Sequence, residues 1–170
     1  MNIKAYNKAI VIILLALAGF KTTSGQEVNE NKNLKKFSQI QDFINSKNYV
    51  FVAQTTLPIG GRAINLTSFY EVRVSGDTVA SDLPYFGRAF VAPMNPSEGG
   101  IHFTSTNFNY KVKGRKKGGW DIAILPKDSK DVRQMLLTVS ESGYGTLQVV
   151  SNNRQQISYN GYVKERKGRV

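Results

Sequence analysis

The chain has 170 residues, 23 lysines and arginines against 12 aspartates and glutamates, and no cysteine, so its formal net charge is +11. The absence of cysteine excludes disulfides, zinc thiolates and a thiol nucleophile. This length fits one domain whose hydrophobic core can form without covalent links.

Residues 1–25 have the layout of a secretory signal peptide. Lys4 and Lys8 precede an apolar run over residues 9–20, and a small, polar stretch ends at Gly25. The run is shorter than the roughly 20 apolar residues that a membrane span needs, and no later segment approaches that length. We predict cleavage after Gly25. Three lysines leave with the signal, so the mature chain would carry a net charge of +8. The signal peptide predicts that the mature chain is periplasmic or secreted, with no transmembrane segment.

Residues 26–33 are expected to be a polar leader, and the segment after them has the spacing of an amphipathic helix. Leu34, Phe37, Ile40 and Ile44 recur at intervals of three and four, while lysine and glutamine occupy the opposite face. We therefore expect one N-terminal amphipathic helix that packs on an apolar surface.

From Tyr49 onward, apolar and polar residues alternate and turn residues recur frequently, which is typical of an antiparallel β domain. Short connections make strands that are neighbours in sequence neighbours in the sheet. The predicted fold of residues 34–163 is mainly β. It consists of about eight antiparallel strands in a meander that closes into a barrel or a two-layer sheet, with the helix packed on it. Residues 164–170 are expected to form a basic tail.

Three local features are predicted within this sheet. Ser75-Gly76-Asp77 should be a hairpin turn, because glycine supplies the positive φ that such turns need. Residues 88–92 read as a short strand. Between Thr104 and Asn107 the apolar side chains change parity, so a β-bulge or a sharp bend is expected there.

Residue types that serve acid–base or covalent catalysis are few and scattered. His102, the one histidine, has opposite parity to Ile101 and Phe103, which is typical of a partly exposed strand residue. There is no G-x-S-x-G motif, EF-hand loop or phosphate-binding glycine loop. We predict no catalytic residue, no metal site and no cofactor. The alternative is an envelope-directed hydrolase that uses Asp or Glu residues with His102.

Basic residues cluster at residues 115–117 and at the C-terminus. Such segments are commonly charged only to keep the surface solvated; because an exported protein meets anionic envelope polymers rather than nucleic acid, the alternative is that they bind such a polymer. An apolar small molecule inside a barrel is the other partner that the pattern allows.

Residues 83–90, LPYFGRAF, are the densest stretch of aromatic and turn residues. Pro84 fixes its own φ, Gly87 permits an unusual backbone angle, and Tyr85 and Phe86 point to opposite sides. The stretch is either a corner between strands that is locked by packing or a ligand-contacting rim. The candidate ligand-binding residues are Tyr85, Phe86, Arg88 and Arg154.

The motifs LPYFGRA (residues 83–89), GGIHF (residues 99–103) and GTLQVVSNNRQQISYNG (residues 145–161) resemble a family of small exported proteins from Bacteroides-type bacteria, catalogued as a domain of unknown function. The resemblance spans residues 51–163. It implies export and a single compact domain, and it carries no activity, ligand or catalytic residue. Many such relatives look lipid-anchored, and this chain departs from them by having no cysteine. The predicted function is an exported, non-enzymatic binding or structural module of the cell envelope.

Overall fold

The computed structural model describes residues 24–91 and 99–166. The chain divides into two compact units, Met1–Leu34 and Lys35–Val170. The first unit contributes the opening turns of helix α2 (Ser24–Asn45), and the second contains the remainder of the helix and the strands. Most of the predicted signal peptide lies outside the described residues.

The described part of the second unit contains nine strands, one more than the approximate number predicted. Every pairing between them is antiparallel. The strands are β1 Asn48–Pro58, β2 Ile64–Ser75, β3 Thr78–Leu83, β4 Ile101–Ser105, β5 Phe108–Gly114, β6 Trp120–Pro126, β7 Val132–Val139, β8 Tyr144–Ser151 and β9 Ile157–Glu165.

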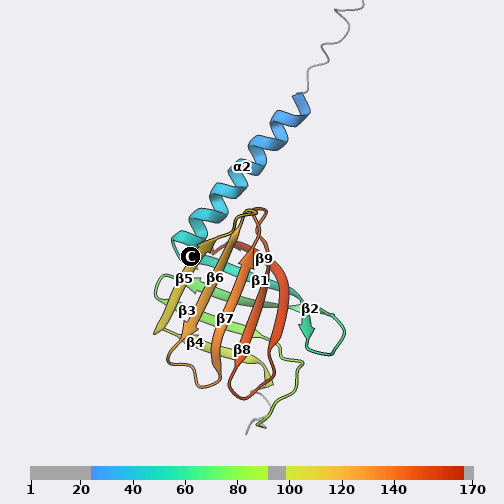
Figure 1. Ribbon diagram of the computed structural model, residues 1–170, viewed down its shortest axis with the longest axis vertical. Helices are drawn as coiled ribbons and strands as arrows, with labels where there is room; N and C mark the ends of the chain where they lie inside the picture. Colours follow the sequence, from blue (N-terminus) through green and yellow to red (C-terminus); the bar gives the residue numbers. More distant parts are fainter. Residues whose placement is uncertain (1–23, 92–98, 167–170) are drawn as a thin grey trace, which may run out of the picture. The chain divides into compact units, whose positions relative to one another are not determined.

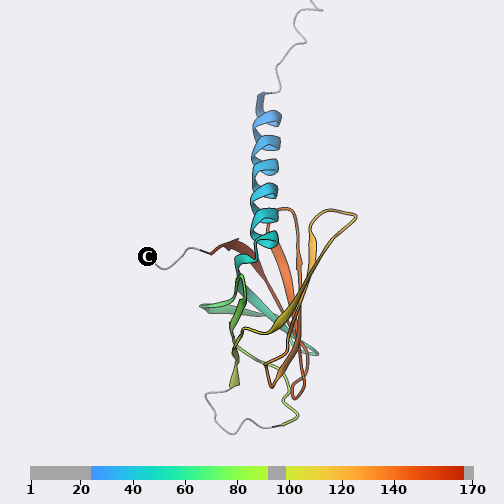
Figure 2. The same ribbon diagram turned by 90° about the vertical axis from the view of Figure 1, so that its left-hand side faces the viewer.

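The strands form one sheet in the order β4-β3-β2-β1-β9-β8-β7-β6-β5. Because the first and last strands pair, the meander nearly closes into a barrel that stays open between β4 and β5. Figures 1 and 2 show β1 to β4 as one layer and β5 to β8 as another that crosses it. The predicted mainly β meander is therefore confirmed, and its form is a barrel-like sheet with one unpaired junction.

The sheet turns from one layer to the other at β1 and β9. The register of β1 shifts between Ala53 and Thr55 on both sides, against β2 and against β9. A bulge of this kind bends a strand and increases its twist. Gly161 lies opposite Ala53, and a Cβ there would overlap the carbonyl oxygen of Val52. The two strands can approach this closely because residue 161 has no side chain.

Large side chains fill the space between the two layers. Tyr49, Phe51 and Tyr159 are fully buried there, together with aliphatic residues from nearly every strand. The hydroxyl of Tyr110 donates a 3.1 Å hydrogen bond to the Ile44 carbonyl oxygen and lies 3.3 Å from the Tyr49 hydroxyl. Burial raises the pKa of Tyr49 well above its ordinary value and that of Tyr110 to about 12, so both hydroxyls stay neutral at physiological pH.

Helix α2 begins ten residues before the predicted stripe and so includes the residues expected to form a polar leader. Within the second unit, Ile40 and Ile44 are buried and Phe37 stacks on Trp120 with ring centroids 5.1 Å apart. This confirms the predicted packing of the helix on the sheet. Leu34, however, is exposed. No helix in the described residues is long and apolar enough to cross a membrane.

The predicted break between Thr104 and Asn107 is confirmed, and it separates β4 from β5. Asp128 holds the break, because its carboxylate accepts hydrogen bonds from the Ser105 hydroxyl and from the backbone N–H groups of Thr106 (3.0 Å) and Asn107 (3.2 Å). The bond from Ser105 is the main reason that the pKa of Asp128 lies below its ordinary value.

The predicted hairpin turn is also confirmed, with Gly76 at φ 58° between β2 and β3.

The predicted strand at residues 88–92 is wrong. Within residues 88–91, the part of this segment that the structure describes, only Ala89 forms a bridge, to Arg154, because the segment pairs with a turn between β8 and β9 instead of a strand. Of the residues expected to form the basic tail, Lys164 and Glu165 belong to β9. Residues 92 and 167–170 lie outside the described part of the chain.

Candidate functional site

The four residues predicted to form a ligand-binding rim divide into two pairs with different surroundings. Tyr85 belongs to the connection after β3, and its hydroxyl lies 2.8 Å from the carbonyl oxygens of both Arg88 and Gln155, to either of which it can donate a hydrogen bond. A Cβ at Gly87 would overlap that hydroxyl. The connection therefore curls around the Tyr85 ring and fixes it against the β8–β9 turn.

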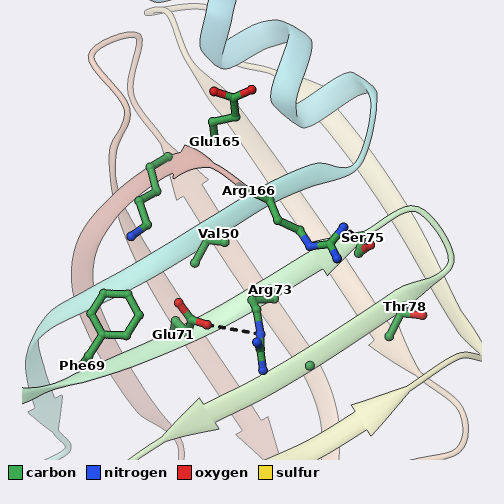
Figure 3. A pocket seen from close by; sticks show the side chains of 10 residues that line it. Val50, Phe69, Glu71, Arg73, Ser75, Thr78, Glu165 and Arg166 are labelled. Atoms are coloured by element: carbon green, nitrogen blue, oxygen red, sulfur yellow. Dashed lines mark hydrogen bonds and ion pairs between the residues drawn. The ribbon is translucent and has the colours of Figure 1, made fainter. Parts of the chain in front are cut away.

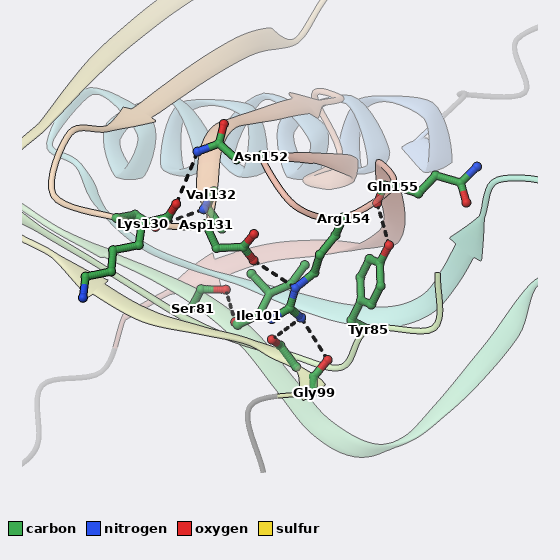
Figure 4. Close-up of polar contacts among 12 residues, drawn as sticks. Ser81, Tyr85, Gly99, Ile101, Lys130, Asp131, Val132, Asn152, Arg154 and Gln155 are labelled. Atoms are coloured by element: carbon green, nitrogen blue, oxygen red, sulfur yellow. Dashed lines mark hydrogen bonds and ion pairs between the residues drawn. The ribbon is translucent and has the colours of Figure 1, made fainter. Parts of the chain in front are cut away.

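Arg154 joins two further segments to this ring, as Figure 4 shows. Its Nε pairs with the Asp131 carboxylate at 3.0 Å, and its Nη1 donates to the carbonyl oxygens of Gly99 (3.0 Å) and Gly100 (2.7 Å). The guanidinium also lies over the Tyr85 ring, 5.3 Å from its centroid. Only 14% of the Arg154 side chain is exposed. Such a planar, multiply bonded arginine holds segments together and has little surface left for a ligand.

A second tyrosine ties the same connection to β9. The Tyr159 hydroxyl donates a 2.6 Å hydrogen bond to the Pro84 carbonyl oxygen. Burial raises the pKa of Tyr159 and of Tyr85, and the Arg154 guanidinium opposes part of each rise. The motifs at residues 83–89 and 145–161 therefore pack against each other. For Tyr85 and Arg154, the geometry favours the corner locked by packing over the ligand-contacting rim.

The other two predicted residues, Phe86 and Arg88, lie in a shallow groove of about 390 Å³ that we call the end groove. Phe86 is 48% exposed, and Arg88 is exposed as well. Three connections meet here, namely β1–β2, β3–β4 and β8–β9. The end groove is lined by Pro58, Ile59, Gly60, Gly61, Arg62, Ile64, Phe86, Gly87, Arg88 and Gln155.

A larger concavity of about 760 Å³, the outer basin, lies on the face of β1, β2, β3 and β9 that points away from the core. Figure 3 shows the charged side chains of β2 and β9 around it. The outer basin is lined by Val50, Phe69, Glu71, Arg73, Ser75, Thr78, Ala80, Lys164, Glu165 and Arg166.

The charged side chains of the outer basin are unequally engaged. Arg73 pairs with Glu71 at 3.2 Å, and the Arg166 guanidinium donates a 2.7 Å hydrogen bond to the Ser75 hydroxyl. The Lys164 ammonium lies 4.7 Å from the centroid of the Phe69 ring, which is 59% exposed. A cation above an aromatic face is weakly bound at an exposed site. The basin thus offers cations and an apolar ring to a ligand that carries negative charge and a flat apolar face.

Sequence reasoning placed residues 164–170 in a tail and did not identify the outer basin. The signal was present in the alternation of β2, where Phe69, Glu71 and Arg73 share the face opposite Val72 and Val74. What the sequence lacked was the pairing of β1 with both β2 and β9, which brings the cations of two distant strands to one surface.

The alternative hydrolase would use Asp or Glu residues with His102, and the structure brings one such pair together. His102 Nδ1 lies 2.9 Å from Asp82 Oδ1 on β3, and both side chains are about half exposed. The opposite ring nitrogen, Nε2, lies over Gly100, where a Cβ would overlap it. No serine or threonine hydroxyl bonds to His102 within residues 24–91 and 99–166. Over the same ranges, no three His, Asp or Glu side chains gather as metal ligands would.

The fold and these surfaces define a small antiparallel β protein with a barrel-like sheet and surface concavities. Residues 31–163 match the family model described as "Domain of unknown function (DUF4251)", and the chain belongs to that family. A crystal structure of a DUF4251 family protein from Bacteroides eggerthii superimposes with a TM-score of 0.57 at 15% identity, covering 76% of this chain and 87% of that one. This likeness shows a shared fold. No functionally curated protein matches the chain.

Proposed function

We propose that this chain is an exported, non-enzymatic binding module of the cell envelope, and that the outer basin binds an anionic polysaccharide. The observation that carries the proposal is the convergence of Arg73, Lys164 and Arg166 with the exposed Phe69 ring in one concavity. Cations are suited to uronate or phosphate groups, and an aromatic ring is suited to the apolar face of a sugar.

The basin has two carboxylates, Glu71 and Glu165, against three cations, so its net charge stays positive. Arg73 holds Glu71 in an ion pair, and only 17% of the Glu71 side chain is exposed. Lys164 faces an aromatic ring and Arg166 a hydroxyl, so neither cation is neutralised by a carboxylate in the described residues. The packed interior supports a surface ligand over an apolar molecule within the sheet, since Tyr49, Phe51 and Tyr159 occupy that space.

Binding of oligogalacturonate, followed by titration calorimetry on the purified mature chain, tests the proposal. We expect binding that weakens as salt is added, with neutral dextran bound far more weakly. The double variant Lys164→Gln and Arg166→Gln should bind roughly three- to thirtyfold more weakly, because each exposed ion pair contributes about 0.3–1 kcal/mol.

The matched control is Lys116→Gln with Lys117→Gln, which removes the same charge from the exposed β5–β6 connection. This variant should bind oligogalacturonate as the parent chain does. An equal loss in both double variants would mean that only overall charge matters, and the outer basin would then be rejected as the site.

Export is tested separately by the mass of the protein recovered from cells that secrete it. The proposal expects a chain that begins at Gln26, which removes the first two residues of α2 and leaves the rest of the helix. Recovery of a chain that retains residues 1–25 would reject a cleaved signal.

A further inference from the structure

Exposed apolar side chains concentrate near the end groove. Ten large hydrophobic side chains are exposed among the described residues, and six of them fall in residues 57–64 and 86–91. Single exposed hydrophobic residues are ordinary on a protein surface, whereas a contiguous group marks an interaction site. The six are Leu57, Ile59, Ile64, Phe86, Phe90 and Val91, of which Ile59, Ile64 and Phe86 line the end groove itself.

The backbone of this region holds these side chains outward. The amide of Gly61 donates to the Pro58 carbonyl oxygen at 3.2 Å, and Gly60 has φ 74°, so a tight turn carries Ile59 with 56% exposure. On the neighbouring connection, Tyr85 is fixed by its hydrogen bonds, and the Phe90 amide donates to the Asn153 carbonyl oxygen at 2.8 Å. The apolar residues therefore remain exposed on well-anchored loops.

The charges around the end groove have one sign. Arg62 and Arg88 line it, and no aspartate or glutamate does. Neither arginine forms an ion pair with a carboxylate within residues 24–91 and 99–166. The outer basin, by contrast, contains two glutamates.

We propose that the end groove and its apolar loops dock the protein on an anionic phospholipid membrane. Half-exposed apolar side chains on adjoining loops can enter the boundary between headgroups and acyl chains, while the two arginines contact lipid phosphates. Charge complementarity supports this occupant, because an anionic bilayer attracts basic residues that lie close to its surface. The projection of the apolar residues from separate loops favours a bilayer over a peptide, which would need one continuous trough. This inference does not depend on polysaccharide binding by the outer basin.

Co-sedimentation of the mature chain with vesicles tests the inference. We expect binding to vesicles of phosphatidylglycerol and phosphatidylcholine in equal parts, and much weaker binding to phosphatidylcholine alone. The double variant Arg62→Gln and Arg88→Gln should partition about 25-fold more weakly, since each arginine near an anionic surface contributes about fivefold.

The double variant Ile59→Ser and Phe86→Ser removes apolar contact and keeps both arginines. Both side chains are about half exposed in the free protein, and this exposed surface would enter the membrane. Its removal should weaken vesicle binding roughly thirtyfold. The matched apolar control is Val112→Ser with Tyr144→Ser, whose side chains are 38% and 61% exposed and lie outside both the end groove and the outer basin. The control should bind vesicles as the parent chain does, and far-ultraviolet circular dichroism should show all variants folded.

Three results would overturn the inference: equal binding to both kinds of vesicle, equal losses in the control and in the end-groove variants, or no vesicle binding at all. A soluble peptide of alternating glutamate and leucine provides a further measurement. If that peptide binds more tightly than vesicles and requires Phe86 and Arg88, the end groove is a peptide site. Failure of polysaccharide binding leaves these outcomes unchanged, because the basin and groove variants affect different residues.

Discussion

Replacement of Arg154 by methionine should destabilise the fold substantially. Methionine keeps an unbranched apolar stem beside the Tyr85 ring and removes the ion pair with Asp131 and the two hydrogen bonds to Gly99 and Gly100. Breaking a fully buried ion pair costs about 3–5 kcal/mol, and this pair is only partly buried. With two carbonyl oxygens also losing their donor, we expect a loss of about 3 kcal/mol in the free energy of unfolding.

The assay is reversible guanidinium unfolding followed by far-ultraviolet circular dichroism, with a thermal scan alongside it. A loss of about 3 kcal/mol should lower the midpoint temperature by roughly 6–12 °C in a domain of this size. Arg154→Lys should lie between the parent chain and Arg154→Met, because lysine keeps the charge and lacks the planar fork that reaches Asp131 and both carbonyl oxygens together.

A double-mutant cycle with Asp131→Asn separates the ion pair from the rest of the cluster. We expect a coupling energy of about 1–2 kcal/mol between the two sites, which are in direct contact. A loss below about 1 kcal/mol in Arg154→Met, with an unchanged denaturant slope, would refute the structural role of Arg154. Residue 154 would then become available again as a ligand-binding residue.

Two further predictions concern the bend and the break of the sheet. Gly161→Ala should lower the free energy of unfolding by more than about 2 kcal/mol in the same guanidinium assay. The added Cβ would overlap the Val52 carbonyl oxygen where β1 and β9 pair. Asp128→Asn should lower the midpoint temperature at pH 7, since the lowered pKa of Asp128 stabilises the fold above about pH 4 and this contribution is lost as the pH falls through the folded-state value. In thermal scans at decreasing pH, the difference in midpoint temperature between the parent chain and Asp128→Asn should shrink. A difference that stays constant from pH 7 to below pH 3 would contradict the assigned hydrogen bonds.

Local patterns predicted the elements of this fold better than they predicted its surfaces. Alternation identified the strands, and the change of parity between Thr104 and Asn107 located the break between β4 and β5, because side-chain direction is a property of a short stretch of backbone. The strand predicted at residues 88–92 is wrong because that prediction, too, used only local sequence. Its composition suits a strand, but its partner is a turn, and no local pattern contains that information.

The candidate site shows the limit more sharply. Aromatic and basic residues in one motif were grouped as a rim, and the fold separates them. Tyr85 faces the hydrogen-bonded cluster around Arg154, while Phe86 faces the end groove. Their opposite directions were predictable from adjacency on an extended segment. Which side would be packed could not be predicted, because it depends on where Gln155 and Asp131 lie after folding.

The residues that this chain shares with its family motifs hold the fold together, and they do not indicate which ligand the protein binds. Tyr85, Arg154 and Tyr159 lie in the motifs by which the chain resembles its family, and each bonds a backbone carbonyl of a different segment. Such contacts specify how the connections dock and leave the ligand unspecified. The outer basin is built from outward positions of β2 and β9 that can change without disturbing the core. Residues 69, 73, 164 and 166 are therefore where ligand preference should be sought, and exchanges at these positions should alter binding while leaving the unfolding midpoint nearly unchanged.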